Sequence, residues 1–135
     1  MTTPVVGGQV LDVPALLDAA TGASEYMRAW LVVMTRRGYT AAVPSAVRAR
    51  AAAQLTTAAE LAELDWFCSG GTVVEVPLAA ADAAELDQLA KDHFAGDTAA
   101  AHAALTARRR DWPVITSEAR APGFTAAGIE VEPLP

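Results

Sequence analysis

The sequence predicts an α/β fold, with three layers (α/β/α) around a mostly parallel central sheet of about five strands. Short β-prone runs alternate with longer helical patterns along the 135 residues, which is typical of right-handed crossovers between parallel strands. Apolar residues make up 53% of the chain and charged residues only 19%, a composition that favours folding over disorder. A chain of this length fits one domain, here residues 1–135.

The first half of the chain contains two predicted strands and three predicted helices. The strands are apolar runs that end near Pro14 and Pro44, because proline cannot continue a ladder of hydrogen bonds. The first helix has Ser24 as its N-cap and apolar residues spaced by three and four, and Gly38 ends it. In chain order the elements are a strand at 9–13, a helix at 25–37, a strand at 39–43, an alanine-rich helix from 45 to about 55, and a helix at 60–68.

The second half contains three predicted strands and two predicted helices. Gly70 and Gly71 end the preceding helix, and a β-branched run follows them. Asp82 and Glu85 resemble a capping box at the start of the next helix. In chain order the elements are a strand at 72–78, a helix from 82 to about 94, a helix from 98 to about 110, a strand at 113–116, a short turn region and a strand at 128–134.

Charge and cysteine content exclude several classes of function. A net charge of −6 and a pI near 4.7 argue against broad electrostatic binding of nucleic acid, although clustered arginines leave room for a local basic rim. The single cysteine, Cys68, can form neither an internal disulfide nor a paired-cysteine zinc site, and we interpret it as a buried small hydrophobe. No apolar run is long enough to span a bilayer and the start of the chain does not resemble a signal peptide, so we expect a cytoplasmic protein without membrane association.

Three carboxylates are candidate site residues because of where they stand. Asp12 interrupts an apolar strand, Asp97 begins a helix, and Glu118 follows Thr116 just after the fourth strand. Taken singly, they would be a solvated strand end, a helix cap and a turn residue. Parallel sheets bind ligands beyond the carboxyl ends of their strands, and carboxylates that converge there repel unless a cation lies between them. Mg²⁺ or Mn²⁺ is the usual cation, which can orient a water on a phosphodiester.

Five segments, in this order along nearly the whole chain, carry a resemblance to a known family. They are VLDVPALL (10–17), VPSAVRARAAAQL (43–55), GDTAAAHAAL (96–105), VITSEAR (114–120) and GIEVEPLP (128–135). The chain is similar to PIN domains, and among them to the toxin ribonucleases of VapC type. The resemblance implies a Mg²⁺- or Mn²⁺-dependent endoribonuclease that cleaves RNA as the toxin of a toxin–antitoxin pair. It also implies a cognate antitoxin protein as partner and a homodimer.

The resemblance implies four acidic residues at the site. Asp12, Asp97 and Glu118 match the first, third and fourth acids, as catalytic and metal-binding residues. Thr116 matches the threonine or serine that often precedes the last acid, and it is the fourth catalytic candidate. The fourth acid is glutamate where aspartate is commoner, so its longer arm shifts any metal-binding oxygen outward.

The second acid of the family pattern is missing. Its position falls at Arg50 or Ala51, and no carboxylate stands between Ser45 and Glu60. Glu60 lies about ten residues further along, or about 15 Å in a helix, which is too far to substitute. An inward-pointing Arg50 would neutralise the other carboxylates without a metal. The alternative to the ribonuclease is therefore an inactive PIN-fold module that binds RNA or a protein. A third possibility is an unrelated α/β binding domain, in which Asp12 and Glu118 would lie at opposite ends of the sheet.

Histidine and aromatic residues give no independent sign of a site. His93 and His102 lie in alanine-rich helical segments without a neighbouring nucleophile, and we expect surface or interface positions for them. The large aromatic residues are expected to pack in the core or at a subunit interface rather than to stack on bases. These are Trp30, Trp66, Phe67 and Trp112.

Overall fold

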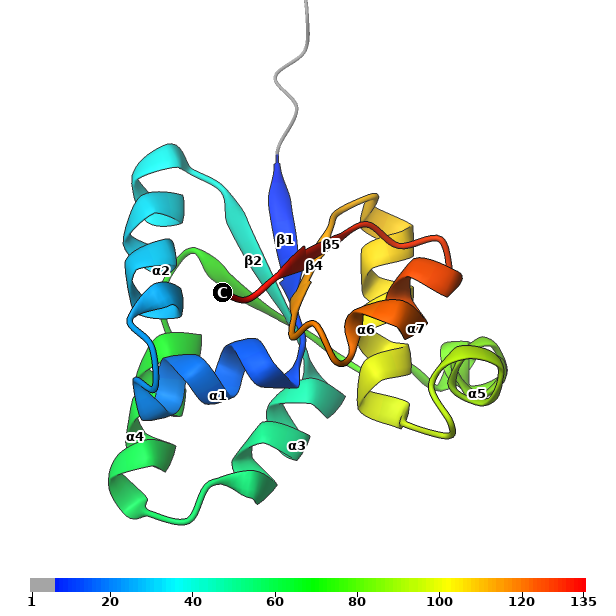
Figure 1. The fold of residues 1–135 in the computed structure, drawn as a ribbon, viewed down its shortest axis with the longest axis horizontal. Helices are drawn as coiled ribbons and strands as arrows, with labels where there is room; N and C mark the ends of the chain where they lie inside the picture. The colour runs from blue at the N-terminus through cyan, green and yellow to red at the C-terminus, as the bar shows by residue number, and fades with distance from the viewer. Residues whose placement is uncertain (1–6) are drawn as a thin grey trace, which may run out of the picture.

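The computed structural model describes residues 7–135, which form a five-stranded parallel sheet with helices on both faces (Figure 1). The strand order is β3-β2-β1-β4-β5, and every pairing is parallel. The predicted three-layer α/β/α fold with a central sheet of five strands is confirmed. The strands are β1 (Gly8–Leu11), β2 (Thr40–Pro44), β3 (Val73–Val76), β4 (Val114–Thr116) and β5 (Val131–Pro133).

The helices form two groups, one on each side of the sheet (Figure 1). The chain moves outward from β1 to β3 with one group of helices, then crosses back to β4 and β5 with the other, as right-handed crossovers require. The first group is α1 (Val13–Thr21), α2 (Tyr26–Arg37), α3 (Ser45–Gln54) and α4 (Ala58–Cys68). The second group is the 3-10 helix η1 (Ala80–Asp82), α5 (Ala83–His93), α6 (Thr98–Arg110) and α7 (Ala121–Ala126).

Two helices, α1 and α7, lie where the sequence predicted a strand end and a turn region. Both contain a proline in the first turn, where the missing N–H has no helical partner to lose. Pro14 therefore starts a helix as well as ending a strand. The predicted capping box at Asp82 and Glu85 is wrong, because the carboxylate of Asp82 makes no cap to α5 and instead accepts a 2.7 Å hydrogen bond from Arg109 of α6.

Alanine allows α6 to lie deep in the molecule. Every residue from Ala99 to Ala107 is buried, because α6 packs against β1, β2 and β4 as well as against α3 and α5. The surface or interface position predicted for His102 is therefore wrong. This side chain is only 3% exposed, and its Nδ1 accepts a 3.4 Å hydrogen bond from the backbone N–H of Ala46. Burial lowers the pKa of His102 below its ordinary value. His93, in contrast, is half-buried at the end of α5.

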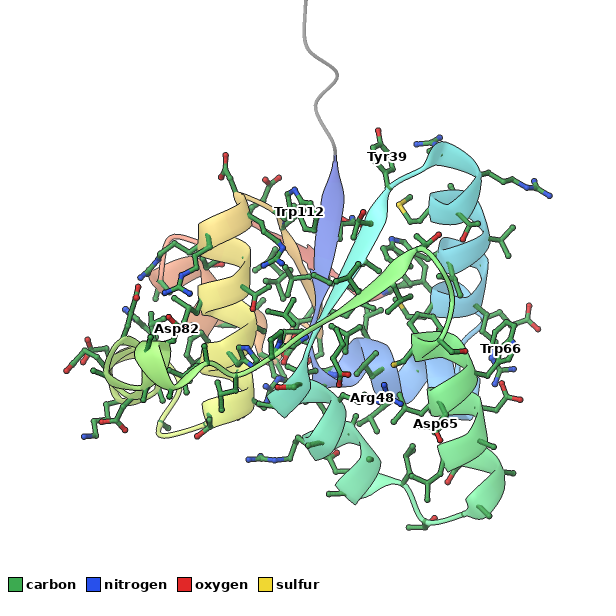
Figure 2. All side chains as sticks on the ribbon, turned by 180° about the vertical axis from the view of Figure 1, so that it is seen from behind. Tyr39, Arg48, Asp65, Trp66, Asp82 and Trp112 are labelled. Carbon is green, nitrogen blue, oxygen red and sulfur yellow. The ribbon has the colours of Figure 1, made fainter. Side chains whose placement is uncertain are left out.

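The aromatic residues divide between the core and the surface. Trp30 and Phe67 are buried in the core, and Trp112 packs against it while remaining partly exposed. Trp66 is 66% exposed and points outward from α4, so it does not pack in the core, and the alternative of a subunit interface stays a prediction (Figure 2). Cys68 is half-buried, and burial raises the pKa of its thiol to about 11, so it is not a reactive thiolate.

The helical pair predicted after β2 is present as α3 and α4. An ion pair joins the two helices, with Nη2 of Arg48 2.9 Å from Oδ1 of Asp65 (Figure 2).

Within residues 7–135, none of the helices has the length and apolar character needed to cross a membrane.

Candidate functional site

Asp12 lies at the carboxyl end of β1, where the chain turns into α1. Its backbone is extended, and its N–H continues the parallel ladder by donating to the carbonyl of Ile115 on β4. Although Asp12 holds the N-cap position of α1, its side chain makes no cap hydrogen bond. The carboxylate is completely buried and turns instead toward the end of the neighbouring strand β4.

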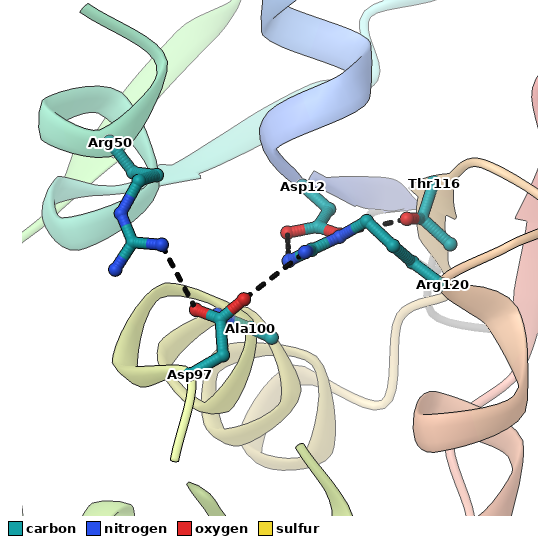
Figure 3. Close-up of polar contacts among 6 residues, drawn as sticks. All are labelled: Asp12, Arg50, Asp97, Ala100, Thr116 and Arg120. Carbon is teal, nitrogen blue, oxygen red and sulfur yellow. Dashed lines mark hydrogen bonds and ion pairs between the residues drawn. The ribbon is translucent and has the colours of Figure 1, made fainter. Parts of the chain in front are cut away.

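Two side chains bind the carboxylate of Asp12 (Figure 3). Oδ2 accepts hydrogen bonds from Oγ1 of Thr116 at 2.8 Å and from Nε of Arg120 at 2.7 Å. Oδ1 accepts a third from Nη2 of Arg120 at 3.1 Å. The guanidinium therefore binds Asp12 in a bidentate manner, by two parallel hydrogen bonds, which is the geometry in which arginine binds a carboxylate most strongly.

Arg120 also binds Asp97, so one guanidinium connects two acids. Its Nη1 donates to Oδ2 of Asp97 at 3.1 Å (Figure 3). Partial burial by itself would lower the pKa of Arg120, but the hydrogen bonds and negative charges of Asp12 and Asp97 outweigh it and raise the pKa. Arg120 is therefore a permanent cation in this site.

Asp97 begins α6 and has two roles. As the N-cap it accepts a 3.2 Å hydrogen bond on Oδ1 from the backbone N–H of Ala100. Nη1 of Arg50, on α3, lies 3.9 Å from the same oxygen. Partial burial would raise the pKa of Asp97, but the Ala100 hydrogen bond and the two arginine charges outweigh it, and the pKa lies below its ordinary value. Asp97 is thus ionised at neutral pH.

The structure brings three of the four predicted site residues together and leaves the fourth outside. Asp12, Asp97 and Thr116 share the hydrogen-bond network around Arg120. Glu118 follows β4 at the same edge of the sheet as Asp12, which contradicts the arrangement of an unrelated domain with these acids at opposite ends. Its side chain is nevertheless exposed and lines a different hollow, between α1 and the C-terminus, with Leu17 and Leu134.

A tight turn explains why Arg120 enters the site and Glu118 does not. The backbone N–H groups of Arg120 and Ala121 both donate to the carbonyl of Ser117, at 3.1 and 3.0 Å. This turn closes directly after Thr116, so it returns the side chain of Arg120 to the strand end and leaves Glu118 on its outer side.

Arg120 is the site residue that the sequence analysis missed. The sequence indicated Arg50 as the internal cation. Arg50 does lie 3.9 Å from Asp97, but among the described residues it makes no ion pair with Asp12. The sequence feature that could have predicted it is the spacing: Arg120 stands four residues after Thr116, and one turn of chain can place its side chain beside the end of the strand.

The side chains at this edge do not fit a Mg²⁺ or Mn²⁺ ion as they are arranged. Both oxygens of Asp12 and one oxygen of Asp97 bind a guanidinium, and a divalent ion would have to share this space with that positive charge. Within residues 7–135, no group of three or more histidine, cysteine, aspartate or glutamate side chains is placed to hold a metal. In the same range every fully buried side-chain nitrogen or oxygen atom has a hydrogen-bond partner.

The comparisons with known proteins give a fold and no family. No family model matches the sequence, and no curated protein is significantly similar to it. Among solved structures, the chain is similar to one in VapBC2 from Rickettsia felis bound to a DNA fragment from their promoter. The TM-score is 0.65 at 14% identity, covering 93% of this chain and 98% of that one. It is also similar to a chain in FitAcB from Neisseria gonorrhoeae, with a TM-score of 0.58 and 20% identity over 91% of this chain and 95% of that one. At these identities the shared property is the fold.

Proposed function

We propose that this chain is a toxin–antitoxin-type protein with a PIN-like fold that works by binding a partner protein rather than by metal-dependent cleavage of RNA. The observation that carries the proposal is the position of Arg120, whose guanidinium binds Asp12 and Asp97 at once. Two carboxyl groups that already bind an internal cation have less attraction for a catalytic metal ion.

The fold comparisons support the partner-binding part of the proposal. VapBC2 and FitAcB are complexes, and the fold of the matched chain in each is similar to that of this chain over nearly the whole length of both. We therefore expect a partner protein of antitoxin type and a homodimer. A net charge of −6 makes RNA a weaker candidate than a protein, because RNA affinity depends on neutralised phosphates.

The second candidate function is a metal-dependent endoribonuclease. The observation that favours it is the convergence of Asp12, Asp97 and Thr116, which match three positions of the family pattern, at one edge of the sheet. It requires that Arg120 leave the carboxylates before Mg²⁺ or Mn²⁺ binds. Glu118 would then have to contribute from its exposed position, or two acids would have to suffice.

RNA cleavage separates the two functions. A mixed RNA pool is incubated with Mn²⁺, Mg²⁺ or chelator, and wild type is compared with an identically purified Asp12→Asn variant. We expect no cleavage that depends on both the metal and Asp12. Cleavage by wild type that chelator and Asp12→Asn each abolish would establish the ribonuclease and contradict the binding proposal.

A further inference from the structure

We propose that the edge of the sheet where the strands begin is a docking surface for an acidic segment of another protein, with one apolar residue as its anchor. This surface, the amino-edge rim, consists of Arg36, Arg37, Tyr39, Arg110 and Trp112. It lies at the opposite edge of the sheet from Asp12. The inference goes beyond the proposed function, because it concerns different residues and holds whether or not the edge at Asp12 binds a metal.

The order of the elements explains why the residues of the rim meet. α2 ends just before β2, α6 ends just before β4, and both strands lie beside β1. Because these strands are parallel, the residues that precede them come to one edge of the sheet. Arg36 and Arg37 end α2, and Tyr39 directly precedes β2. Arg110 ends α6, and Trp112 lies just before β4.

The aromatic side chains of the rim lie on either side of the start of β1 (Figure 2). A Cβ on Gly7 would lie 2.7 Å from the ring of Tyr39, and a Cβ on Gly8 would lie 2.7 Å from the ring of Trp112. The guanidinium carbon of Arg110 lies 5.8 Å from the centre of the Trp112 ring, within the range of a cation–π contact. The rim therefore extends from the end of α2, across the start of β1, to the end of α6.

The arginines of the rim are the cations that remain available to a partner. The described residues include all ten lysines and arginines, and six of these make ion pairs with carboxylates. A seventh, Arg108, donates a 3.0 Å hydrogen bond to the carbonyl of Ala127. Among the described residues, only Arg36, Arg37 and Arg110 have neither kind of partner, and all three are exposed. Exposed guanidinium groups at one edge of an acidic protein attract carboxylates, which they can bind in a bidentate manner.

A hollow beside the rim provides a place for an apolar side chain. It has a volume of about 280 Å³. Its lining includes the apolar side chains of Met34 and Pro113, the ring of Tyr39, and the charged side chains of Arg37 and Glu132. A cavity of about 150 Å³ suffices for a benzene ring, so the hollow accommodates one leucine or phenylalanine side chain.

Glu132 determines what the hollow accepts. Its Oε2 accepts a hydrogen bond from Nε2 of Gln9, whose Oε1 accepts a 2.7 Å hydrogen bond from Nε1 of Trp30. A carboxylate inside the hollow would be repelled by Glu132, whereas outside it the rim arginines attract acids. Glu132 and the exposed Asp111 and Glu130 at the same edge also oppose a strand of RNA, because every nucleotide carries a negative phosphate. The surface therefore favours a peptide segment with acidic residues on both sides of one apolar residue.

The test is a titration of the ¹⁵N-labelled protein with the peptide Glu-Glu-Leu-Glu-Glu at low ionic strength, followed by nuclear magnetic resonance. We expect the indole N–H signal of Trp112 and the backbone N–H signals of Gly8 and Tyr39 to shift with saturation, and that of Asp12 to stay in place. Glu-Glu-Ala-Glu-Glu should bind about tenfold more weakly, because alanine buries less apolar surface in the hollow. Added salt should weaken both peptides.

A pair of double variants separates the rim from the net charge of the protein. Arg37→Gln with Arg110→Gln should raise the Kd of the leucine peptide about fivefold, because two charged partners of its carboxylates are lost. Arg28→Gln with Lys91→Gln is the matched control, since it removes two cations that are already paired with Glu63 and Asp87 away from the rim. The control should change the Kd less than about twofold.

Three results would overturn the inference. The first is the absence of saturable shifts at the rim up to millimolar peptide. The second is equal weakening by the two double variants, which would show that net charge and not the rim sets the affinity. The third is a single-stranded RNA hexamer that shifts the signals of the rim and binds more tightly than the leucine peptide, which would assign the surface to nucleic acid.

Discussion

Replacing Arg120 with alanine removes two of the three side-chain hydrogen bonds to Asp12 and leaves its completely buried carboxylate without a counter-charge. Breaking a buried ion pair by removing one partner costs about 3–5 kcal/mol. Arg120 is 31% exposed at its side chain, so water enters the vacated space and solvates part of the charge. We therefore expect the free energy of unfolding to fall by about 2–4 kcal/mol in the absence of divalent metal.

The size of the protein converts this loss into a melting temperature. An unfolding entropy of about 2.1 cal/mol/K per residue gives about 280 cal/mol/K for 135 residues. Each kcal/mol then corresponds to about 3.5 °C, and the variant should melt about 7–14 °C below wild type. The melts are run in chelator, and urea titrations of the same samples give the free energy directly.

Arg50 and Asp12 provide the controls. Arg50→Ala removes a partly exposed cation that lies 3.9 Å from Asp97, and it should change stability by no more than about 0.5 kcal/mol. Asp12→Asn combined with Arg120→Ala should cost less than the sum of the single changes, because each removes the same interaction. An Arg120→Ala protein within about 1 kcal/mol of Arg50→Ala would refute the reasoning that Arg120 is the principal partner of a buried charge.

Three further outcomes test the fold away from Arg120. Burial lowers the pKa of His102, so on acidification the unfolded chain binds a proton at this histidine before the folded protein does. The free energy of unfolding should therefore fall as the pH drops below about 6.5, and urea titrations at several pH values should show a smaller fall for His102→Gln. Gly8→Ala places a Cβ 2.7 Å from the Trp112 ring and should lower the free energy of unfolding by about 1–3 kcal/mol, whereas Gly71→Ala, whose Cβ meets nothing within 4 Å, should not lower it. Equal Cm values for the two variants in urea titrations would contradict this prediction. Thr57→Ala removes a capping box on α4 and should cost about 1 kcal/mol by thermal melting, and an unchanged Tm would show that the box is not maintained in solution.

The sequence predicted most of the sheet because local patterns decide where a strand can form. β-Branched runs bounded by proline or glycine located all five strands to within a few residues. Short helices were harder to predict. α1 and α7 each have a proline in the first turn, and in a sequence such a proline indicates the end of an element as readily as the start of a helix. Whether a helix forms there depends on packing against other elements.

The sequence predicted that Asp12, Asp97 and Glu118 would converge, and the structure brings the first two together with Thr116 while Glu118 stays exposed. Asp12 and Thr116 lie at the ends of neighbouring parallel strands and Asp97 begins the helix that packs across those strands, so the topology brings them to one edge. Whether that edge binds a metal stays a prediction, which the RNA cleavage experiment with Mn²⁺ and Mg²⁺ addresses.

Only the tertiary structure decided what neutralises these carboxylates. The direction of Arg120 depends on one turn at Ser117, and the same turn keeps Glu118 in solvent. The burial of His102 depends likewise on α6 lying between the sheet, α3 and α5. A residue's identity fixes its charge and reach, but the backbone path around it sets which other charges lie within a few ångströms, and in a low-dielectric interior that proximity decides its role.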